Sequence, residues 1–490
     1  MPSSTSPSRT AAPLPVPAGT WTLRLWGLLF VLAGNMLIDA LEVSVVVVAL
    51  PSIGADLGLP LTSAQWTMTG FAIGFGGLML FGGRVVALLG RRRVYLAALL
   101  GFAAASVAGA LAADPTLLMA TRVIKGFCAA LTAPTGLAII STEFPAGPAR
   151  DRALSVYTLF GASGFTAGLL LSGALTAVDW RLTLAFPAPV VLVLFLCGLR
   201  LIPGPGPDGG GPPPGGEPRR YDVAGAATFA GGLLALVAGI VSVPSHGWDD
   251  PRSGGLLVLA ALLFAAFALV ERRSPQPLVR FSAFRGALAR SALGAACLNG
   301  SYLGLLLVLT YQLQTLHGWS PLRTALAFLP AALPLAVTAL LSGRLVAAFG
   351  APRLIAVGAL FPLAGYLLLL GQTWPLSYGS AVLPTMLLVG AGFVLSFAAL
   401  NMQATSGLPP AERGTGSGLY QTAVQAAAAV VPAVVAALLT AGRPAAGAPP
   451  AEVLAACRPA LVLVAVIGAA GLLTGVAGVL ATRGDRPGAV

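Results

Sequence analysis

Four charged side chains lie deep inside apolar stretches of this sequence. Asp39 and Glu42 lie in the first stretch, and Arg122 and Lys125, the only lysine of the chain, lie in the fourth. Each pair is spaced i, i+3, so a helix carries both members of a pair on one face. An acid that exchanges a proton beside a compensating cation is the chemistry of proton coupling in a membrane. We therefore expect these four residues to form a proton-coupling charge cluster.

The depth of the charges favours pairing between the two stretches. Glu42 precedes Leu50 by eight residues, and Lys125 follows Leu117 by eight. At a rise of about 1.5 Å per residue, both side chains lie about 12 Å below the outer boundary. One unpaired charge at this depth costs roughly 2.5–3.5 kcal/mol, so all four are expected to face the protein interior. Lys125 is expected to neutralise either Glu42 or Asp39; the alternative is a charged staple that only fixes helix packing.

The composition defines the elements that must position these charges. Hydrophobic residues make up 57% of the 490 residues and charged residues only 9%, whereas soluble domains contain about 25% charged residues. The chain is therefore expected to be an all-α integral membrane protein with many spans. No Walker loop, nucleophile elbow or zinc motif stands out, and the four cysteines form no CxxC pair. We expect no enzyme activity, no metal and no cofactor, with an ion gradient as the energy source.

Fourteen stretches are long enough to span a bilayer as helices. Their approximate ranges are 25–50, 64–83, 94–113, 117–140, 153–177, 183–202, 223–243, 254–271, 287–312, 322–343, 353–372, 380–405, 415–441 and 459–482. The expected organisation is a disordered tail (1–20), a six-helix lobe (21–203), a Gly/Pro linker (204–222), two additional helices (223–284), a second six-helix lobe (285–482) and a short tail (483–490).

The distribution of basic residues predicts the orientation. With the N-terminus in the cytoplasm, 21 arginines fall in cytoplasmic segments and 5 in outer segments, and Arg122 and Lys125 complete the 28. This asymmetry follows the positive-inside rule, so both termini are expected in the cytoplasm. The net charge of +12 then faces the inner leaflet, and no nucleic-acid partner is needed.

Two cytoplasmic segments repeat each other. "GRVVALLGRRRV" at 83–94 and "GRLVAAFGAPRL" at 343–354 share one pattern at a spacing of 260 residues. We expect each to be a loop between two spans, and the repeat implies two similar halves related about an axis along the membrane normal. The alternative is two unrelated basic turns, which the positive-inside rule also produces. The residues assigned to these cytoplasmic gate loops are Gly83, Arg84, Gly90, Arg93, Gly343, Arg344, Gly350 and Arg353.

These segments resemble the major facilitator superfamily, in particular its fourteen-spanner drug:proton antiporter (multidrug efflux) branch. The stretches that carry the resemblance are the loop at 83–94, "LEVSVVVVALP" at 41–51, "RVIKGFCAA" at 122–130, "WRLTLAFPAP" at 180–189, "YDVAGA" at 221, "ERRSPQPLVRFSAFR" at 271 and "GWSPLRTALAFLP" at 318–330. The resemblance covers nearly the whole chain.

The resemblance implies a fold and a function. It implies two six-helix lobes plus two extra helices, and export of small amphipathic or hydrophobic compounds, such as drugs or antibiotics, by proton-coupled alternating access. Its implied partners are a small-molecule substrate, protons and membrane lipid, in a monomer of the bacterial plasma (inner) membrane. In the family the first and fourth helices line the same half of the central cavity. Alternatives are a dedicated exporter of one metabolite or lipid, and a transport-inactive sensor or scaffold.

The sequence also departs from the pattern of that branch. Ala87 and Ala347 replace the usual acid of the loop, Glu42 replaces Asp, Lys125 replaces Gln, and Leu169 replaces the expected Pro of the fifth helix. The loss of the acid at Ala87 removes one expected partner of the gate. The fifth helix keeps a glycine motif formed by Gly161, Gly164, Gly168 and Gly173.

Polar residues in the spans are candidates to line the substrate path. They are Asn35, Asn299, Tyr302, Gln312, Asn401, Gln403, Gln421 and Gln425. Hydrogen bonds between helices are the alternative role for such side chains.

Overall fold

The computed structural model describes most of the chain. The described residues are 22–145, 147–204, 222–274, 277–279, 284–338, 341–373, 375–409, 412–442 and 448–484. The tail at 1–20, most of the linker at 204–222 and most of the tail at 483–490 lie outside the described residues. Every regular element within the described part is helical, which confirms the all-α fold class.

Among the described residues, the first half of the chain forms eleven helices. They are α1 (Leu23–Ser44), α2 (Leu50–Asp56), α3 (Leu61–Ala64), α4 (Trp66–Leu89), α5 (Arg91–Ala110), α6 (Pro115–Glu143), α7 (Pro148–Thr176), α8 (Arg181–Ala185), α9 (Pro187–Leu201), α10 (Val223–His246) and α11 (Pro251–Arg273).

The part of the second half that the structure describes forms eight α-helices and two π-helices. They are α12 (Gly286–Tyr311), η1 (Gln312–Leu316), α13 (Pro321–Thr338), α14 (Ser342–Phe349), α15 (Ala351–Leu370), η2 (Tyr378–Val382), α16 (Leu383–Ser406), α17 (Arg413–Ala441), α18 (Pro450–Ala456) and α19 (Arg458–Gly484).

Thirteen helical segments of the described part are long and apolar enough to cross a membrane. The remaining expected span, 322–343, corresponds to α13, which ends just before the undescribed residues 339–340. The observed helices therefore agree with the expected fourteen spans, although several of the expected boundaries shift by a few residues.

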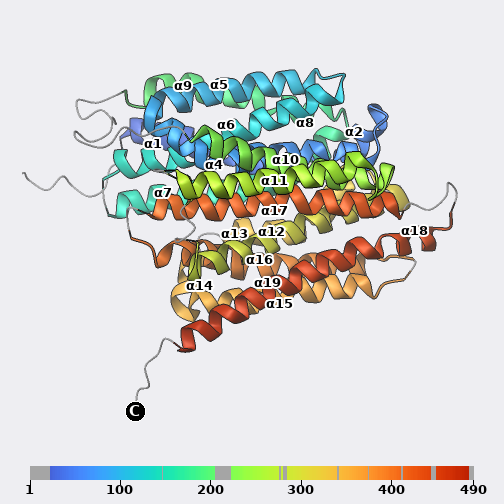
Figure 1. Cartoon of the computed structure of the whole chain (residues 1–490). Helices are drawn as coiled ribbons and strands as arrows, with labels where there is room; N and C mark the ends of the chain where they lie inside the picture. The colour runs from blue at the N-terminus through green and yellow to red at the C-terminus, as the bar shows by residue number, and fades with distance from the viewer. Residues whose placement is uncertain are drawn as a thin grey trace, which may run out of the picture.

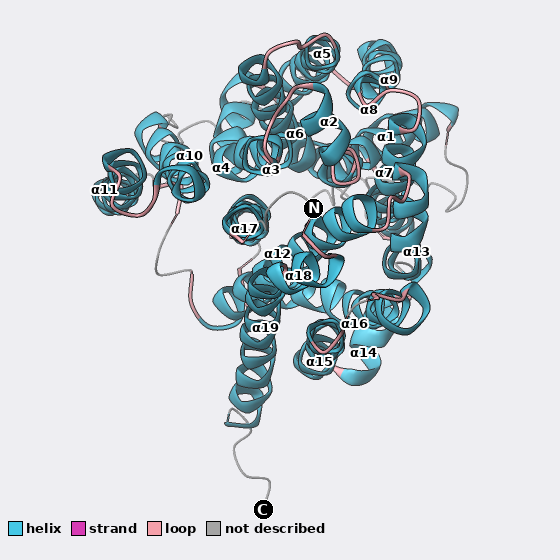
Figure 2. Ribbon diagram, turned by 90° about the vertical axis from the view of Figure 1, so that its right-hand side faces the viewer, coloured by secondary structure: helices cyan, strands magenta, loops and turns pink. Residues whose placement is uncertain are grey.

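The helices run side by side and form two blocks (Figure 1). One block contains α1 and α4 to α9, and the other contains α12 to α17 and α19. The blocks meet through two helix pairs, α4 with α17 and α7 with α13. Figure 2 shows the hairpin of α10 and α11 at the side of the bundle, where α10 packs against α4 and α17.

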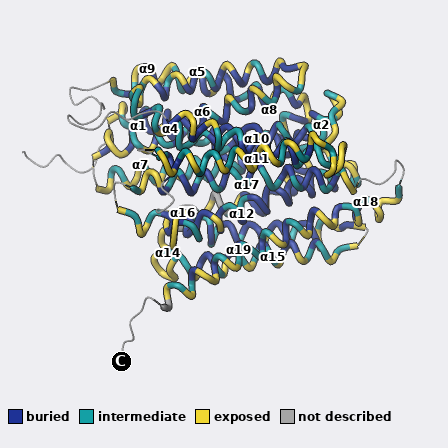
Figure 3. The backbone as a smooth tube through the Cα atoms, viewed as in Figure 1, coloured by how far each residue is buried: buried dark blue, intermediate teal, exposed yellow. Residues whose placement is uncertain are grey.

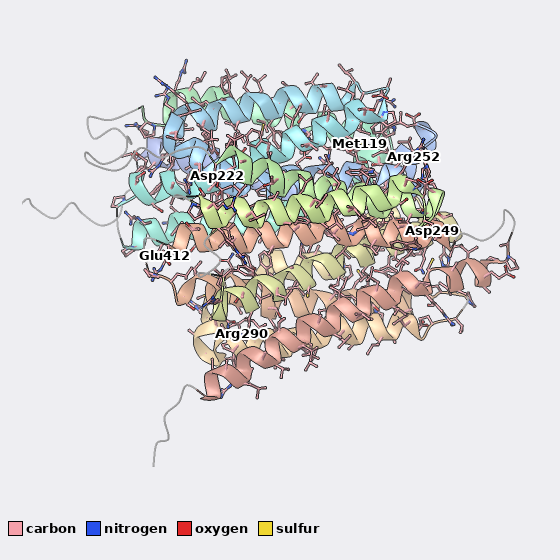
Figure 4. All side chains as sticks on the ribbon, viewed as in Figure 1. Met119, Asp222, Asp249, Arg252, Arg290 and Glu412 are labelled. Carbon is pink, nitrogen blue, oxygen red and sulfur yellow. The ribbon has the colours of Figure 1, made fainter. Side chains whose placement is uncertain are left out.

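Two ends of the bundle are distinguished by charge. Figure 4 labels Asp222, Arg290 and Glu412 at one end and Asp249 and Arg252 at the other. The first is called the arginine-rich end here, because it carries the following residues: Arg91, Arg92, Arg93, Arg344, Arg353 and Arg413. The second is called the opposite end, and α2 lies there.

Figure 3 shows buried residues gathered in the middle of the bundle and exposed residues along its outer helices. Many of the exposed residues within the spans are apolar. Leu196, Leu262 and Leu473 are more than half exposed although each lies in a span. In a soluble protein a surface of this kind would mark an interface; here it faces the hydrocarbon of the membrane. The deep charges are therefore the feature that needs an explanation.

The first span does not continue as one helix to residue 50, so that expectation is wrong. α1 ends at Ser44, and residues 45–49 form turns with Val47 N–H donating to Ser44 O and Ala49 N–H to Val46 O, both at 3.1 Å. The sequence supplies a reason, since four consecutive valines have low helix propensity and Pro51 lies in the first turn of α2.

The two repeated arginine segments are not loops as expected. α4 continues through Gly83 and Arg84 to Leu89, and α5 begins at Arg91, so Gly90 alone joins the two helices. Gly350 joins α14 to α15 in the same way. Gly90 has φ 87° and ψ 141°, and Gly350 has φ 79° and ψ 139°. This positive φ is the reason that glycine stands at both positions.

Candidate proton-coupling site

Close helix packing brings α6 onto α4. α6 begins with Asp114 as its N-cap, which accepts a hydrogen bond from Leu117 N–H at 3.0 Å, and Pro115 follows in the first turn. One turn beyond Arg122, a Cβ on Gly126 would lie 2.7 Å from Phe75 N and would also overlap Phe71 O. The absence of a side chain at Gly126 thus allows the two backbones to approach, which places the Arg122 side chain against α4.

Glu42 is the centre of a buried ion cluster. Arg122 Nη1 pairs with Glu42 Oε2, and Lys125 Nζ pairs with Glu42 Oε1. The side chain of Glu42 is 0% exposed and those of Arg122 and Lys125 are 1% exposed. Both carboxylate oxygens therefore contact cations in an environment without solvent.

Arg122 also holds the backbone of two neighbouring helices. Its Nη2 donates to the carbonyl oxygen of Glu42 at 3.0 Å, and its Nε donates to Thr67 O at 2.6 Å. Arg122 thus links α1, α4 and α6 through all three of its nitrogens. The rigid guanidinium fork suits such a multiple contact better than an ammonium does.

Aromatic rings complete the surroundings of both cations. The Arg122 guanidinium lies 5.0 Å from the centre of the Phe71 ring, and Lys125 Nζ lies 4.9 Å from that of Phe102. A ring face attracts a cation, and more strongly where water is excluded. Two cations with one carboxylate leave a surplus of one positive charge, which the rings of α4 and α5 help to accommodate.

Asp39 lies one turn away on α1 and has different partners. Its Oδ2 accepts hydrogen bonds from Asn35 Nδ2 and from Thr132 Oγ1, both at 2.9 Å. Its Oδ1 has no hydrogen-bond partner among the described residues, although Asp39 is only 1% exposed. Of the two acids left open as partners of Lys125, the structure places Lys125 on Glu42.

The glycine motif of α7 packs against α1. A Cβ on Gly161 would approach Met36, one on Gly164 would lie 2.5 Å from Leu37 O, and one on Gly168 would lie 2.6 Å from Leu41 O. Gly173, by contrast, faces α13, where a Cβ would lie 3.0 Å from Pro321 O. The first three glycines therefore let α7 approach α1, and Gly173 lets the end of α7 approach α13 of the second block.

Hydrogen bonds join the two blocks. Gln314 Nε2 donates to Val48 O at 3.0 Å, and Thr166 Oγ1 on α7 donates to Ala332 O on α13 at 3.0 Å. Residues 45–50 are 0% exposed and belong to the same apolar core as the end of α12. The turns that follow α1 are thus enclosed between the blocks.

The structure does not bring the eight polar candidates into one site. Asn35 contacts Asp39, and Asn299 Nδ2 lies 3.5 Å from Val424 O. Tyr302 lies between Phe165 of α7 and Phe393 of α16, with ring centres 5.6 Å and 4.9 Å away. Of the remaining candidates, Gln312, Gln403 and Gln425 are buried, Gln421 is half-buried and Asn401 is exposed.

The gate residues lie on helix ends at the arginine-rich end. Arg84 Nη2 donates to Pro277 O at 2.8 Å, in the segment that follows α11. Arg93, Arg344 and Arg353 are exposed. Added Cβ atoms at Gly83 and Gly343 would meet nothing within 4 Å, so close packing does not require glycine at these two positions.

Several residues of the site were missed by the sequence analysis. Thr132 binds Asp39, and Phe71 and Phe102 lie under the cations. A signal existed for Thr132, because it follows Lys125 by seven residues and two helical turns return to the same face. Nothing in the local sequence marks Phe71 or Phe102 among 21 phenylalanines.

A comparison with known protein families identifies the family of this chain. A family model described as the Major Facilitator Superfamily matches residues 32–432. The chain belongs to the Major Facilitator Superfamily. This confirms the resemblance seen in the sequence, and the apolar helices identify a multi-pass membrane protein that transports small molecules.

Three similar proteins come from bacteria. The chain is 38% identical to the puromycin resistance protein pur8 of Streptomyces alboniger over 83% of this chain and 80% of the relative. It is 34% identical to the cephamycin export protein CmcT of Amycolatopsis lactamdurans over 78% and 79%. It is 28% identical to the tetracenomycin C resistance and export protein of Streptomyces glaucescens over 86% and 77%.

Solved structures support the superfamily fold. A crystal structure of the peptide transporter POT in complex with sulfate matches with a TM-score of 0.62 at 17% identity, covering 94% of both chains. The human organic anion transporter MFSD10 matches with a TM-score of 0.60 at 17% identity, covering 93% of this chain and 100% of that one. Identity this low supports the fold alone.

Proposed function

We propose that this chain exports small amphipathic compounds, such as antibiotics, from a bacterial cell by proton-driven alternating access. Three relatives with antibiotic resistance or export in their names support export as the direction and antibiotics as the substrate class. In this proposal the substrate, protons and surrounding lipid are the partners, the protein acts as a monomer, and no cofactor is needed.

The observation that carries proton drive is the buried ion cluster of Glu42, Arg122 and Lys125. Breaking such a cluster by removing one partner strongly destabilises the protein, and replacing it by apolar residues is often neutral or stabilising. Buried ionisable residues inside a membrane protein therefore indicate function by default, and transfer of a proton is the function that acids and bases serve there.

The proposed orientation places the arginine-rich end in the cytoplasm. Arg91, Arg92 and Arg93 begin α5 at that end, and Arg344 and Arg353 lie at the matching place of the second block. Positive residues favour the cytoplasmic side of spans. Both termini then lie in the cytoplasm, and the contact of Gln314 with Val48 lies at the outer side.

The charge of the site bears on the substrate. Each oxygen of Glu42 contacts a cation, so this acid offers no free negative charge to a cationic drug. Neutral or weakly charged amphipathic compounds therefore suit the site at least as well as dications do. A substrate of this kind can gain affinity from apolar and aromatic side chains.

A second candidate function is dedicated export of one self-made metabolite. The relatives named for cephamycin and for tetracenomycin C are each named for a single antibiotic. A narrow susceptibility profile would favour this candidate, whereas protection against several unrelated compounds would favour a multidrug exporter.

Expression in a bacterial host that lacks its own efflux pumps tests the proposal. Wild-type cells should tolerate higher concentrations of puromycin or of another compound in a panel of amphipathic antibiotics than cells with the empty vector. In everted membrane vesicles, uptake of the same compound should start when a proton gradient is formed and stop when nigericin collapses it. Transport that persists without the gradient, or no transport across the panel, would reject the proposal.

A further inference from the structure

We propose that Asp39, rather than Glu42, is the carboxyl group that binds and releases the coupling proton. This inference rests on the proposed proton-driven export. It follows from a difference between two acids that lie one turn apart on the same face of α1 and are equally buried.

The surroundings of Glu42 hold it in the ionised form. Its two oxygens contact Arg122 and Lys125, and its carbonyl oxygen accepts a further bond from Arg122. Protonation of Glu42 would leave two adjacent buried cations without an anion. Leaving buried charges unpaired is among the most unfavourable changes in a protein interior.

The surroundings of Asp39 fit a neutral carboxylic acid. Oδ2 accepts two hydrogen bonds, as the carbonyl oxygen of an acid does, and Oδ1 has none among the described residues. Burying an uncharged O–H without a partner costs less than burying a charged oxygen without one, so we place the acid proton on Oδ1. The structure thus accommodates Asp39 in its protonated form.

Other titratable groups around Asp39 do not supply a countercharge. The groups that interact with it electrostatically are Glu42, Tyr95, Cys128 and Tyr157. Tyrosine and cysteine side chains are uncharged near neutral pH, and Glu42 carries the same sign as an ionised Asp39. The Tyr157 hydroxyl donates to Ala133 O at 3.1 Å and so is directed elsewhere.

Release of the proton is nevertheless feasible because of the neighbouring cluster. Glu42, Arg122 and Lys125 together carry one surplus positive charge, so loss of the proton from Asp39 makes the four groups formally neutral. Gain of the proton restores the surplus. The cluster therefore makes both protonation states of Asp39 accessible while Glu42 stays ionised.

The proton state of Asp39 is coupled to packing through Oδ1. When Asp39 is ionised, Oδ1 requires a hydrogen-bond donor. Water supplies this donor if α1 moves away from α6 and lets water reach Oδ1. When Asp39 is protonated, Oδ2 keeps its hydrogen bonds from Asn35 and Thr132, and no unpaired negative charge remains in the dry packing. Protonation therefore favours the closed arrangement of α1 and α6, and deprotonation favours a hydrated one.

Infrared spectroscopy of the full-length protein in lipid tests this assignment directly. The C=O stretching band of a buried carboxylic acid should be present in the wild type, absent in Asp39→Asn and present in Glu42→Gln. It should also be present in Glu271→Gln, which removes another buried acid, and in Asp56→Asn, which removes an exposed one. A band that disappears in Glu42→Gln and persists in Asp39→Asn would overturn the proposal.

A milder variant keeps the test valid if Asp39→Asn does not fold. Thr132→Val removes one hydrogen bond to Oδ2 and keeps both acids. Loss of this hydrogen bond destabilises the protonated form of Asp39 less than the ionised form. The band should therefore persist to a pH that is about one unit higher than in the wild type. An unchanged titration would contradict the assignment.

Transport separates failure of this inference from failure of the proposed function. If wild-type protein in proteoliposomes shows no gradient-driven transport of puromycin or any panel antibiotic, the proposed function fails. If the wild type and Asp39→Asn show equal gradient-driven transport, only the assignment of Asp39 fails. The expected result is loss of gradient-driven uptake in Asp39→Asn with exchange of the transported compound retained.

Discussion

The hydroxyl group of Ser44 on α1 occupies the space that a Cβ at Gly168 on α7 would need. The same hydroxyl donates to the carbonyl oxygen of Phe165 at 2.8 Å. Phe165 in turn contacts the ring of Tyr302 in the second block. A side chain two residues from Glu42 thus sets the distance between α1 and a helix that contacts both blocks.

Substitution of Gly168 should separate α1 from α7. In Gly168→Ala the new methyl group would lie 2.6 Å from Leu41 O and would displace the Ser44 hydroxyl. Overpacking of this kind destabilises proteins by about 1–3 kcal/mol. The thermal unfolding midpoint in detergent should therefore fall, and transport should be impaired.

Gly83→Ala is the matched control for Gly168→Ala. Gly83 lies in α4, and an added Cβ would meet nothing within 4 Å. Alanine also favours a helix over glycine by about 1 kcal/mol, so the unfolding midpoint should stay the same or rise. Equal losses in both variants would show that close contact with α1 is not the cause.

Much of the fold could be predicted because the membrane restricts it. Apolar length and arginine distribution located the spans, and the spacing of Asp39, Glu42, Arg122 and Lys125 put each pair on one helix face. The ends of the helices were predicted less well. Arg84 ended the expected second span, yet α4 continues six residues past Gly83, because a long arginine can reach a polar partner such as Pro277 O.

The choice of partner within the site could not be predicted from sequence. Asp39 and Glu42 lie one turn apart, so a small rotation or shift of α6 decides which acid Lys125 contacts. That position depends on backbone contacts such as Gly126 against Phe71, which involve residues distant in the sequence. With the 260-residue spacing of Gly90 and Gly350, Asn299 and Tyr302 are the sequence positions in the second half that correspond to Asp39 and Glu42, and both carry neutral side chains.

Removal of Glu42 should be more harmful than removal of Lys125. Glu42→Gln leaves Arg122 and Lys125 buried without an anion, and breaking a buried pair in this way costs about 3–5 kcal/mol. Lys125→Met leaves the pair of Glu42 and Arg122 intact, so this variant should lose less stability. Unfolding midpoints of the purified variants in detergent measure both effects.

The double variant Glu42→Gln/Lys125→Met provides the control for this comparison. It leaves one buried cation, Arg122, without an anion instead of two, so it should be more stable than Glu42→Gln alone, which is a coupling that a double-mutant cycle detects. Additive losses would mean that the two side chains do not interact. Lys125→Arg keeps the charge and should retain most of the stability.

The exposed pair of Asp56 and Arg181 predicts a pH effect outside the membrane. Hydrogen bonds from the Arg181 guanidinium, at 2.7 Å, and from the Trp180 indole, at 3.1 Å, hold the pKa of the Asp56 carboxyl below its usual value. A lowered pKa contributes stability above the unfolded value of about 3.9 and loses it as the pH falls through the folded value.

The stability difference between wild type and Asp56→Asn should therefore be constant from neutral pH down to about 4.5 and vanish only in stronger acid. Thermal unfolding at a series of pH values measures it. Asp249→Asn, which removes an exposed acid at the same end, is the control and should show no such difference. A difference that disappears near neutral pH would contradict the role of this pair.

The hydrogen bond from Gln314 to Val48 O should help to keep the opposite end closed. Gln314→Leu removes the donor and leaves the Val48 carbonyl oxygen buried without this partner. One hydrogen bond contributes about 0.5–1.5 kcal/mol, so the open population should rise about two- to tenfold. In a chain without its native cysteines, Val48→Cys should then react correspondingly faster with a maleimide. Gln372→Leu is the control, because the Gln372 side chain bonds to Leu368 O at the end of α15 and so stays within the second block. Equal acceleration by both substitutions would show that loss of a glutamine near this end, rather than the contact between blocks, exposes residue 48.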